Sequence, residues 1–317
     1  MLGFISNFMV LVIDLLFGNA LNPVLPAPVV LTELRLAQYQ RAIRYAADAF
    51  FADPDDLDFE LYDPTETTVV YQDSNDKAVV TKFGDTCYAS FSGARVRSIE
   101  GILTDGTQGI GIFGSQEVCG GAGCCQLDRG ITRAYFSDYV EEFEALVRSC
   151  VASCASGNCD LVLTGHSQGA AISQIAAVAL ADLNPLLFAF GPQKMIHAWH
   201  TPCGALNNME TFYRTVSQCE DDAGEPLYDS QTLLGVLWGR QTGTMILVGD
   251  GGAQTMAINR DVTLMPARDQ CHNVFLHYMD PISQLMAGPL DGFVSGSKCT
   301  RNMECKSQSC ADNNRCR

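Results

Sequence analysis

The sequence predicts an α/β fold, in which a mostly parallel central sheet is covered by helices on both faces. Short apolar runs typical of strands alternate along the chain with amphipathic segments typical of helices. The clearest unit is LVLTGHSQGAA at residues 161–171, which predicts a buried strand, a sharp turn and an alanine-rich helix. With 317 residues and 47% hydrophobic content, the chain is long enough for one large domain with a well-buried core.

Three further helices are predicted from apolar periodicity. In residues 32–51 the apolar positions recur three or four residues apart: Leu36, Tyr39, Ile43, Ala46 and Phe50. Residues 135–149 carry a similar apolar face. Residues 274–286 predict a terminal helix whose regularity Pro281 reduces.

Strands are predicted at residues 67–71, 78–82, 88–91, 186–190, 212–216 and 245–248. Residues 101–130 are rich in glycine, include three cysteines and show weak periodicity. They therefore predict a long functional loop rather than a core element.

The turn of the clearest unit contains the motif G-x-S-x-G, from Gly165 to Gly169. In a strand–turn–helix context this motif places a serine on a strained turn, with its hydroxyl exposed at the helix N-terminus. Glycines are expected at both ends because the helix passes close to the strand. The nearby backbone N–H groups favour developing negative charge, so Ser167 is predicted to be a nucleophile.

A nucleophilic serine needs a histidine base, and the chain contains five histidines. His166 lies beside the nucleophile and is expected to point away from it. His197 and His200 precede any acid that could follow a later strand. His277 lies within the predicted last helix, whereas His272 lies on the loop before it, so His272 is the predicted base.

The residue that orients this histidine is expected after the strand at residues 212–216. Glu220, Asp221 and Asp222 follow that strand closely, although a run of acidic residues is usually a solvated loop. Asp229 lies further along and has apolar neighbours that would bury it, as an orienting carboxylate requires. These residues alone leave the acid open.

The two ends of the chain differ in composition from the rest. Residues 1–20 are apolar and end in small residues, which predicts a signal peptide cut after Ala20, although Asp14 interrupts the apolar run. Residues 295–317 carry four cysteines and almost no large apolar side chains, which predicts a disulfide-stapled tail. Residues 21–294 then form the main domain. Fourteen cysteines agree with secretion into an oxidising compartment.

The charge of the chain excludes several classes of partner. A net charge of −16 argues against binding to nucleic acid and to anionic membrane surfaces. No nucleotide-binding loop is present, and the cysteines at 150, 154 and 159 lack the paired C-x-x-C spacing of zinc sites. We therefore expect no cofactor and no metal, and we expect a monomer.

Several motifs together resemble the class 3 lipases, the fungal triacylglycerol-lipase-like branch of the α/β-hydrolases, from about residue 32 to residue 286. The elbow LTGHSQGA, the FGPQ segment at 190–193 and CHNVFLHYM at 271–279 resemble family segments. LDRGI at 127–131 lies where the family carries H-x-G-F, with Asp128 in place of the histidine. The resemblance implies an α/β-hydrolase fold and His272 as the catalytic base.

The resemblance also implies an acid and an oxyanion hole. YRTVSQCED at 213–221 is similar to the family segment that carries the acid, and it implies Asp221, with Glu220 and Asp229 as alternatives. No V-P-x-L-P stretch follows it. The backbone amides of Ala94 and Gln168 would hold the oxyanion, although the family has a hydroxyl residue where Ala94 stands. Residues 97–103 lie where fungal members carry a lid helix.

These observations predict a secreted carboxylic-ester hydrolase, most simply a lipase acting on triacylglycerol or another lipid. Its substrate partner would be a lipid or ester, with contact at a lipid interface. An esterase acting on small or cell-wall esters, such as feruloyl groups, is the first alternative. The second is a non-catalytic binding protein that retains the fold.

Overall fold

The computed structural model describes most of the predicted main domain. The described residues are 27–49, 63–71, 77–93, 115–121, 123–138, 140–154, 159–197, 203–207, 209, 211–229, 239–240, 242–249, 252–258 and 267–293. The predicted signal peptide at 1–20, the oxyanion residue Ala94, the lid segment 97–103 and the tail at 295–317 lie outside them.

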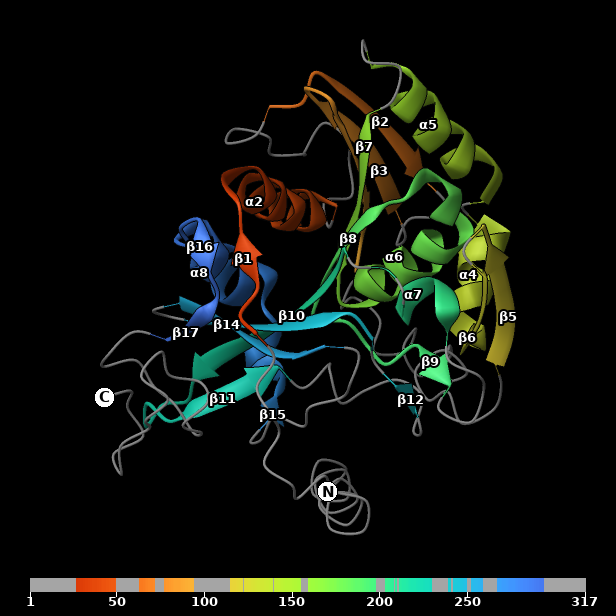
Figure 1. Cartoon of the computed structure of the whole chain (residues 1–317). Coiled ribbons are helices and arrows are strands. Elements are labelled where there is room, and N and C mark those ends of the chain that lie inside the picture. The colour runs from red at the N-terminus through yellow and green to blue at the C-terminus, as the bar shows by residue number, and fades with distance from the viewer. Residues whose placement is uncertain are drawn as a thin grey trace.

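A large mixed sheet runs through the centre of the molecule (Figure 1). Its middle strands are parallel neighbours, in the order β4 (Thr86–Phe91), β7 (Asp160–His166), β8 (Leu186–Phe190), β10 (Phe212–Glu220) and β13 (Thr244–Gly249). Antiparallel strands flank them: β3 (Lys77–Phe83) and β2 (Glu66–Tyr71) on one side, β14 (Gly252–Ile258) and β17 (Asp291–Phe293) on the other.

Helices cover both faces of this sheet (Figure 1). One face packs against α2 (Glu33–Asp48), the π-helical turn η5 (Val274–Met279) and α8 (Asp280–Ser283). The other packs against α4 (Arg129–Asp138), α5 (Val140–Ala152) and α6 (Gln168–Ala179). This arrangement confirms the predicted α/β fold, with a mixed sheet whose five central strands are parallel.

Apolar burial holds each helical layer to the sheet. Beneath α2, the ring of Tyr39 lies 5.0 Å from Phe188 and 5.5 Å from Phe190, measured between centroids. On the opposite face, Phe91 of β4 lies 4.8 Å from Phe143 of α5. Because aromatic side chains bury large areas, these contacts fix the helices against the strands that carry the site.

The N-terminal helix is shorter than predicted and begins at a capping residue. Thr32 is the N-cap of α2, and its hydroxyl oxygen accepts a hydrogen bond from the Arg35 amide at 3.2 Å. The predicted helix at 135–149 is divided between α4 and α5. The predicted helix at 274–286 is η5 followed by the short α8, in which Pro281 occupies the first turn, where proline is tolerated.

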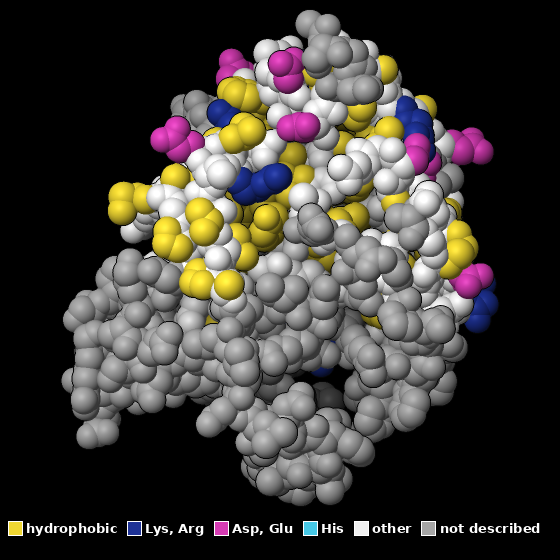
Figure 2. All heavy atoms as spheres, viewed as in Figure 1, with side chains coloured by type: hydrophobic (Ala, Val, Ile, Leu, Met, Phe, Trp, Pro, Cys, Tyr) yellow, Lys and Arg dark blue, Asp and Glu magenta, His cyan; other side chains and the backbone are white. Residues whose placement is uncertain are grey.

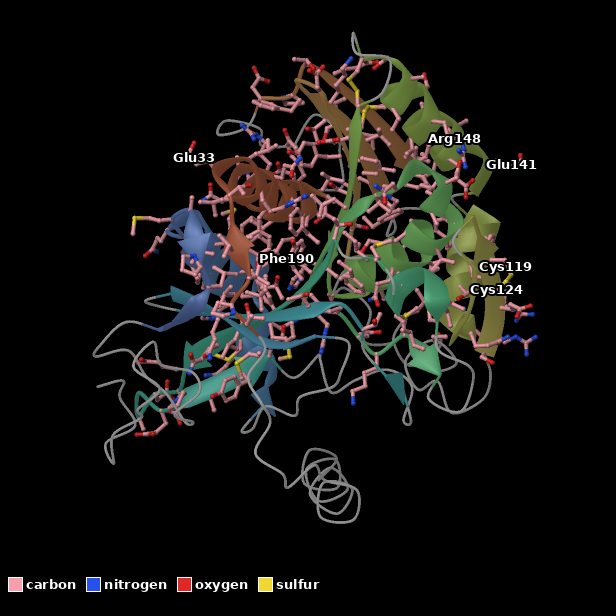
Figure 3. The ribbon with its side chains drawn as sticks, in the orientation of Figure 1. Glu33, Cys119, Cys124, Glu141, Arg148 and Phe190 are labelled. Carbon is pink, nitrogen blue, oxygen red and sulfur yellow. A yellow bond between two sulfur atoms is a disulfide. The ribbon has the colours of Figure 1, made fainter. Side chains whose placement is uncertain are left out.

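The predicted loop at residues 101–130 is wrong for its second half. Residues 115–128 form a hairpin of β5 (Ser115–Gly120) and β6 (Gly123–Asp128). Cys119 and Cys124 close the hairpin as a disulfide, and both are labelled at the edge of the molecule in Figure 3. The buried side chains of Val118, Cys125 and Leu127 hold the hairpin against α6. The hairpin was not predicted because the segment has too few alternating apolar residues among its glycines to indicate strands.

Strand β10 is four residues longer than predicted and continues to Glu220. It then turns back into β11 (Pro226–Asp229), which pairs antiparallel with it. Gln218 is opposite Tyr228, so the end of β11 returns toward the middle of the sheet.

All ten cysteines of the main domain form disulfides: Cys87–Cys150, Cys119–Cys124, Cys125–Cys203, Cys154–Cys159 and Cys219–Cys271. Three of these pairs are separated by more than 50 residues in the sequence and therefore join distant parts of the fold. The tail cysteines lie outside the described residues.

The remaining short elements are β1 (Val30–Leu31), η2 (Ala181–Leu183), β9 (Ile196–His197), α7 (Gly204–Asn207), β12 (Gly239–Arg240), β15 (Ala267–Arg268), η4 (Asp269–His272) and β16 (Gly288–Pro289). Figure 2 shows hydrophobic side chains gathered over β16 and α8, and Val30, Leu34 and Met286 are the most exposed large ones described. Within the described ranges, no helix has the length and apolar content needed to cross a membrane.

Candidate active site

Ser167 lies on a strained turn between β7 and α6. Its backbone has φ 59° and ψ −125°, a conformation that side-chain-bearing residues rarely adopt. A Cβ on Gly165 would lie 2.3 Å from the carbonyl of Gly169, and one on Gly169 would lie 2.1 Å from the carbonyl oxygen of Phe91. The two glycines therefore allow the helix to start directly against strands β7 and β4.

The turn is held in place by neighbouring strand β8. The amide of Ser167 donates a hydrogen bond of 2.9 Å to the carbonyl oxygen of Phe190, the last residue of β8. Ser167 itself is half-buried, and it precedes Gln168, the first residue of α6. Amides in the first turn of a helix lack partners within the helix, so this end of α6 favours a negative charge beside the serine.

His272 and Asp229 form a close pair at the edge of the sheet where Ser167 lies. Nδ1 of His272 lies 2.8 Å from Oδ2 of Asp229. The Asp229 side chain is 0% exposed and the His272 side chain is 18% exposed. The hydroxyl of Tyr278 donates a short hydrogen bond to the same carboxylate oxygen. A buried carboxylate is thus held by two donors, one of them the imidazole.

This pair lies beside the turn that carries Ser167. Gly191 follows Phe190, whose carbonyl accepts the Ser167 amide. A Cβ on Gly191 would lie 2.8 Å from Oδ2 of Asp229 and 3.0 Å from Cε1 of His272. The ring of His166 is stacked on that of His272, with 4.3 Å between centroids. Nε2 of His272, the nitrogen that faces away from Asp229, is buried and accepts no hydrogen bond from any described group.

The structure does not bring Asp221 to His272. Oδ1 of Asp221 accepts hydrogen bonds from the amides of Ala223 and Glu225, at 2.9 and 2.8 Å, and so stabilises the turn between β10 and β11. Glu220 and Asp222 are exposed at the same turn. Because β10 is longer than predicted, these residues lie beyond the site, and β11 returns with Asp229 at its end.

His166 faces the site rather than away from it, in contrast to the prediction. Burial holds the pKa of His166 well below its usual 6.5, and the charge of the neighbouring His272 lowers it further. His166 therefore remains neutral when His272 is stacked on it.

The buried neutral state of His166 should make the protein less stable in acid. Between the lowered pKa of the folded state and about 6.5, the unfolded chain binds more protons than the folded one, so stability falls as the pH drops below about 6.5. One such group contributes at most about 1.4 kcal/mol per pH unit. We expect urea midpoints between about pH 7 and pH 5 to fall more steeply for the wild type than for His166→Leu. Equal slopes for the two proteins would contradict this role of His166.

Three ligand-type side chains of the site also lie close enough to hold a metal ion, namely those of His166, Asp229 and His272, within 4.8 Å of one another. The Nδ1 atom of His272 is already hydrogen-bonded to Asp229, so a metal ion bound between these side chains would break that hydrogen bond. Cys150, Cys154 and Cys159 are all in disulfides. We assign no metal ion to the three site side chains or to the three cysteines.

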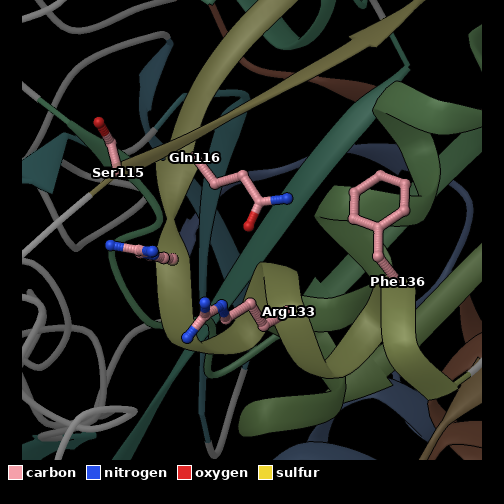
Figure 4. A pocket seen from close by; sticks show the side chains of 5 residues that line it. Ser115, Gln116, Arg133 and Phe136 are labelled. Atoms are coloured by element: carbon pink, nitrogen blue, oxygen red, sulfur yellow. The ribbon is translucent and has the colours of Figure 1, made fainter.

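A separate surface pocket of about 690 Å³ lies between β5 and α4 (Figure 4). Its lining residues are Ser115, Gln116, Arg129, Arg133 and Phe136. None of them belongs to the group around Ser167.

Asp128, where the sequence departs from the family histidine, lies at the start of α4, and its carboxylate accepts a hydrogen bond of 3.1 Å from the Ile131 amide. It acts there as an N-terminal cap.

Two residues of the site were not predicted from the sequence. Tyr278 donates to Asp229, and the hydroxyl of Ser217 donates a short hydrogen bond to the carbonyl of Cys271, which precedes His272. Tyr278 lies six residues after His272 in an apolar segment. A tyrosine there has the appearance of an ordinary core residue, so the pattern held no signal for its polar contact.

Comparison with known proteins bears on the family and the fold. Residues 94–215 match the family model described as lipase (class 3). No curated protein matches the sequence. A structure titled as a triacylglycerol lipase with a serine protease triad as its catalytic centre has a TM-score of 0.52 at 16% identity, over 77% of this chain and 95% of that one.

Two named fungal enzymes have similar folds. The Rhizomucor miehei lipase in its propeptide complex has a TM-score of 0.51 at 14% identity, covering 83% of this chain and 84% of that one. The mono- and diacylglycerol lipase from Aspergillus oryzae has a TM-score of 0.50 at 18% identity, over 73% of this chain and 88% of that one. Identities this low establish the fold alone. Together with the family match over residues 94–215, they confirm that the chain resembles the class 3 lipases and shares their α/β-hydrolase fold.

Proposed function

We propose that this chain is a lipase-type carboxylic-ester hydrolase with Ser167 as nucleophile, His272 as base and Asp229 as the orienting acid. The observation that carries the proposal is the 2.8 Å hydrogen bond between His272 and the buried Asp229, beside a serine on a strained strand-to-helix turn. The class 3 lipase match over residues 94–215 and the serine triad named for a lipase of similar fold support it. Asp229 takes the role that the sequence resemblance gave to Asp221.

The proposed reaction proceeds through an acyl-enzyme. Ser167 Oγ attacks the ester carbonyl while Nε2 of His272 takes its proton, and the protonated imidazole then gives that proton to the leaving alcohol. Asp229 fixes the imidazole tautomer that keeps Nε2 unprotonated at the start. Water, activated by the same histidine, hydrolyses the acyl-serine and restores the free hydroxyl.

The tetrahedral oxyanion would be held by backbone amides. Gln168 offers its amide at the start of α6, and Ala94 is the second proposed donor. Where relatives of this type have a hydroxyl residue, Ala94 has a methyl group. A lost side-chain donor costs about 2–4 kcal/mol of transition-state stabilisation, so we expect a modest kcat.

A lipid is the proposed substrate class. Phe275 and Leu276 follow His272 closely and are 38% and 59% exposed, so apolar surface lies on the segment that carries the base. Five disulfides support folding in an oxidising compartment, as expected of a secreted enzyme. We therefore propose secretion after removal of residues 1–20.

Hydrolysis of p-nitrophenyl esters of increasing acyl length tests the proposal. For a lipase we expect activity on both short and long acyl chains, with the greater kcat/KM on the long ones, because long chains bury more apolar surface. Activity confined to short chains would indicate an esterase for small or cell-wall esters. No activity on any ester would contradict the proposal and favour a binding protein that retains the fold.

A further inference from the structure

We propose that Tyr278 is a positioning residue for the proposed triad, which it serves by fixing the carboxylate of Asp229 in the orientation that His272 needs. This inference rests on the proposed function. Tyr278 lies in η5, six residues after His272, whereas Asp229 ends β11. The segment that carries the base therefore contacts the acid twice.

Both contacts meet at one oxygen. The hydroxyl of Tyr278 donates to Oδ2 of Asp229, and Nδ1 of His272 lies 2.8 Å from the same atom. Two donors from different directions leave the carboxylate little freedom to rotate. Since the imidazole orientation follows the carboxylate, the tyrosine acts on His272 through Asp229.

The ring of Tyr278 is rigidly held. Its side chain is fully buried, and its ring packs edge-on against His166 at 5.2 Å and Phe190 at 6.3 Å between centroids. Burial raises the pKa of Tyr278 well above 10, and the charge of Asp229 raises it further. The hydroxyl therefore remains a donor at every pH at which the enzyme would work.

A second contact holds the other end of the segment. The hydroxyl of Ser217, on β10, donates to the carbonyl of Cys271, and the Cys219–Cys271 disulfide joins the same strand to the same residue. The backbone just before His272 is thus tied to β10. Tyr278 ties the segment after His272 to β11 through Asp229.

Among the described residues, few charged groups surround this arrangement. His166 of β7 faces the ring of Tyr278, and His277 precedes it within η5. On α2, Arg44 contacts Met279 and pairs with Asp48, with 3.5 Å between the charged atoms. Asp280 of α8 is exposed. Among the groups facing the site, Asp229 is therefore the charge that His272 experiences most directly.

Loss of the Tyr278 hydroxyl should move the pH profile of ester hydrolysis in a definite direction. Its hydrogen bond withdraws charge from the Asp229 carboxylate, so without it the carboxylate attracts protonated His272 more strongly. The acid limb of the kcat/KM profile is then expected to move to higher pH. For Tyr278→Phe we expect this limb to rise by roughly half a pH unit and kcat to fall about tenfold, with KM within about threefold.

The test compares pH profiles of ester hydrolysis for the wild type, Tyr278→Phe and a matched control, Tyr135→Phe. Tyr135 is also fully buried, and its hydroxyl donates to Oε1 of Glu144 at 3.0 Å, away from the site. We expect the control to keep the wild-type profile. An unchanged acid limb and kcat in Tyr278→Phe would overturn the inference, while Ser167-dependent activity would still support the proposed function.

A measurement on the unaltered protein covers the case in which Tyr278→Phe does not fold. Proton NMR of the wild type should show a nuclear Overhauser contact between the Nδ1 proton of His272 and a slowly exchanging tyrosine hydroxyl proton, since both point at one oxygen. Absence of this contact, with the His272 proton observed, would also overturn the inference. If ester hydrolysis instead persists in Ser167→Ala, the proposed function itself fails. The pH profiles of the tyrosine variants cannot reveal this outcome, so the Ser167→Ala measurement accompanies them.

Discussion

Replacing Ser167 with alanine should lower kcat for ester hydrolysis by about 10⁵- to 10⁶-fold, as loss of the nucleophile does in serine hydrolases. The remaining rate would come from substrate binding and the oxyanion amides. The substitution removes one hydroxyl from a half-buried residue, so we expect the urea midpoint to change little. Steady-state kinetics with a p-nitrophenyl ester measure the effect.

Ser173→Ala provides the matched control on the same helix. Ser173 is buried in α6, and its hydroxyl donates to the carbonyl of Ala170 at 2.9 Å. Its removal alters local packing without touching the site, so kcat should stay within about twofold of wild type. Equal losses in the two variants would mean that Ser167 matters only for folding.

Replacing Asp229 with asparagine should lower kcat by about 10⁴-fold. The amide keeps the shape of the carboxylate but can donate to Nδ1 of His272, which favours the tautomer with the proton on Nε2. That tautomer cannot accept the proton of Ser167. Because Asp229 is fully buried, the variant also needs a stability measurement, and circular dichroism with urea unfolding provides it.

Asp221→Asn distinguishes the two candidate acids. Oδ1 of Asp221 accepts two amides in the β10–β11 turn, and an asparagine keeps that acceptor without the charge. The replacement should therefore cost at most about 0.5–1.5 kcal/mol of stability and leave kcat within about twofold. The reverse outcome, with the large loss in Asp221→Asn and a small one in Asp229→Asn, would restore Asp221 as the acid and contradict the site described above.

Much of the fold could be predicted because its signals are local. The five central strands and the elbow are short apolar runs, and the bounds of β8 match the prediction at both ends. Ser167 could be singled out as the candidate nucleophile for the same reason, since its glycines, its strand and its helix are adjacent in sequence. His272 was predicted by elimination among five histidines, from chain order and from its place on the loop before the predicted last helix.

Asp229, the proposed acid, could not be chosen from the sequence because its position depends on how far β10 extends. A strand ending at residue 216 would leave residues 220–222 near the sheet edge, but β10 continues to Glu220 and β11 returns with Asp229. The residues at 213–221 carry no local signal for the hairpin of β10 and β11. Tyr278 was missed for a related reason, because its contact with Asp229 joins segments 49 residues apart.

Covalent labelling with a p-nitrophenyl phosphonate ester is the most direct measurement of the proposed chemistry. An activated serine beside His272 should release one p-nitrophenol per chain, and intact mass should rise by one phosphonyl group. Peptide mapping should place that group on Ser167. Asp229→Asn should react far more slowly and Asp221→Asn at the wild-type rate. No adduct on the folded wild-type protein, or an adduct on a residue other than Ser167, would contradict an ester hydrolase built on Ser167, His272 and Asp229.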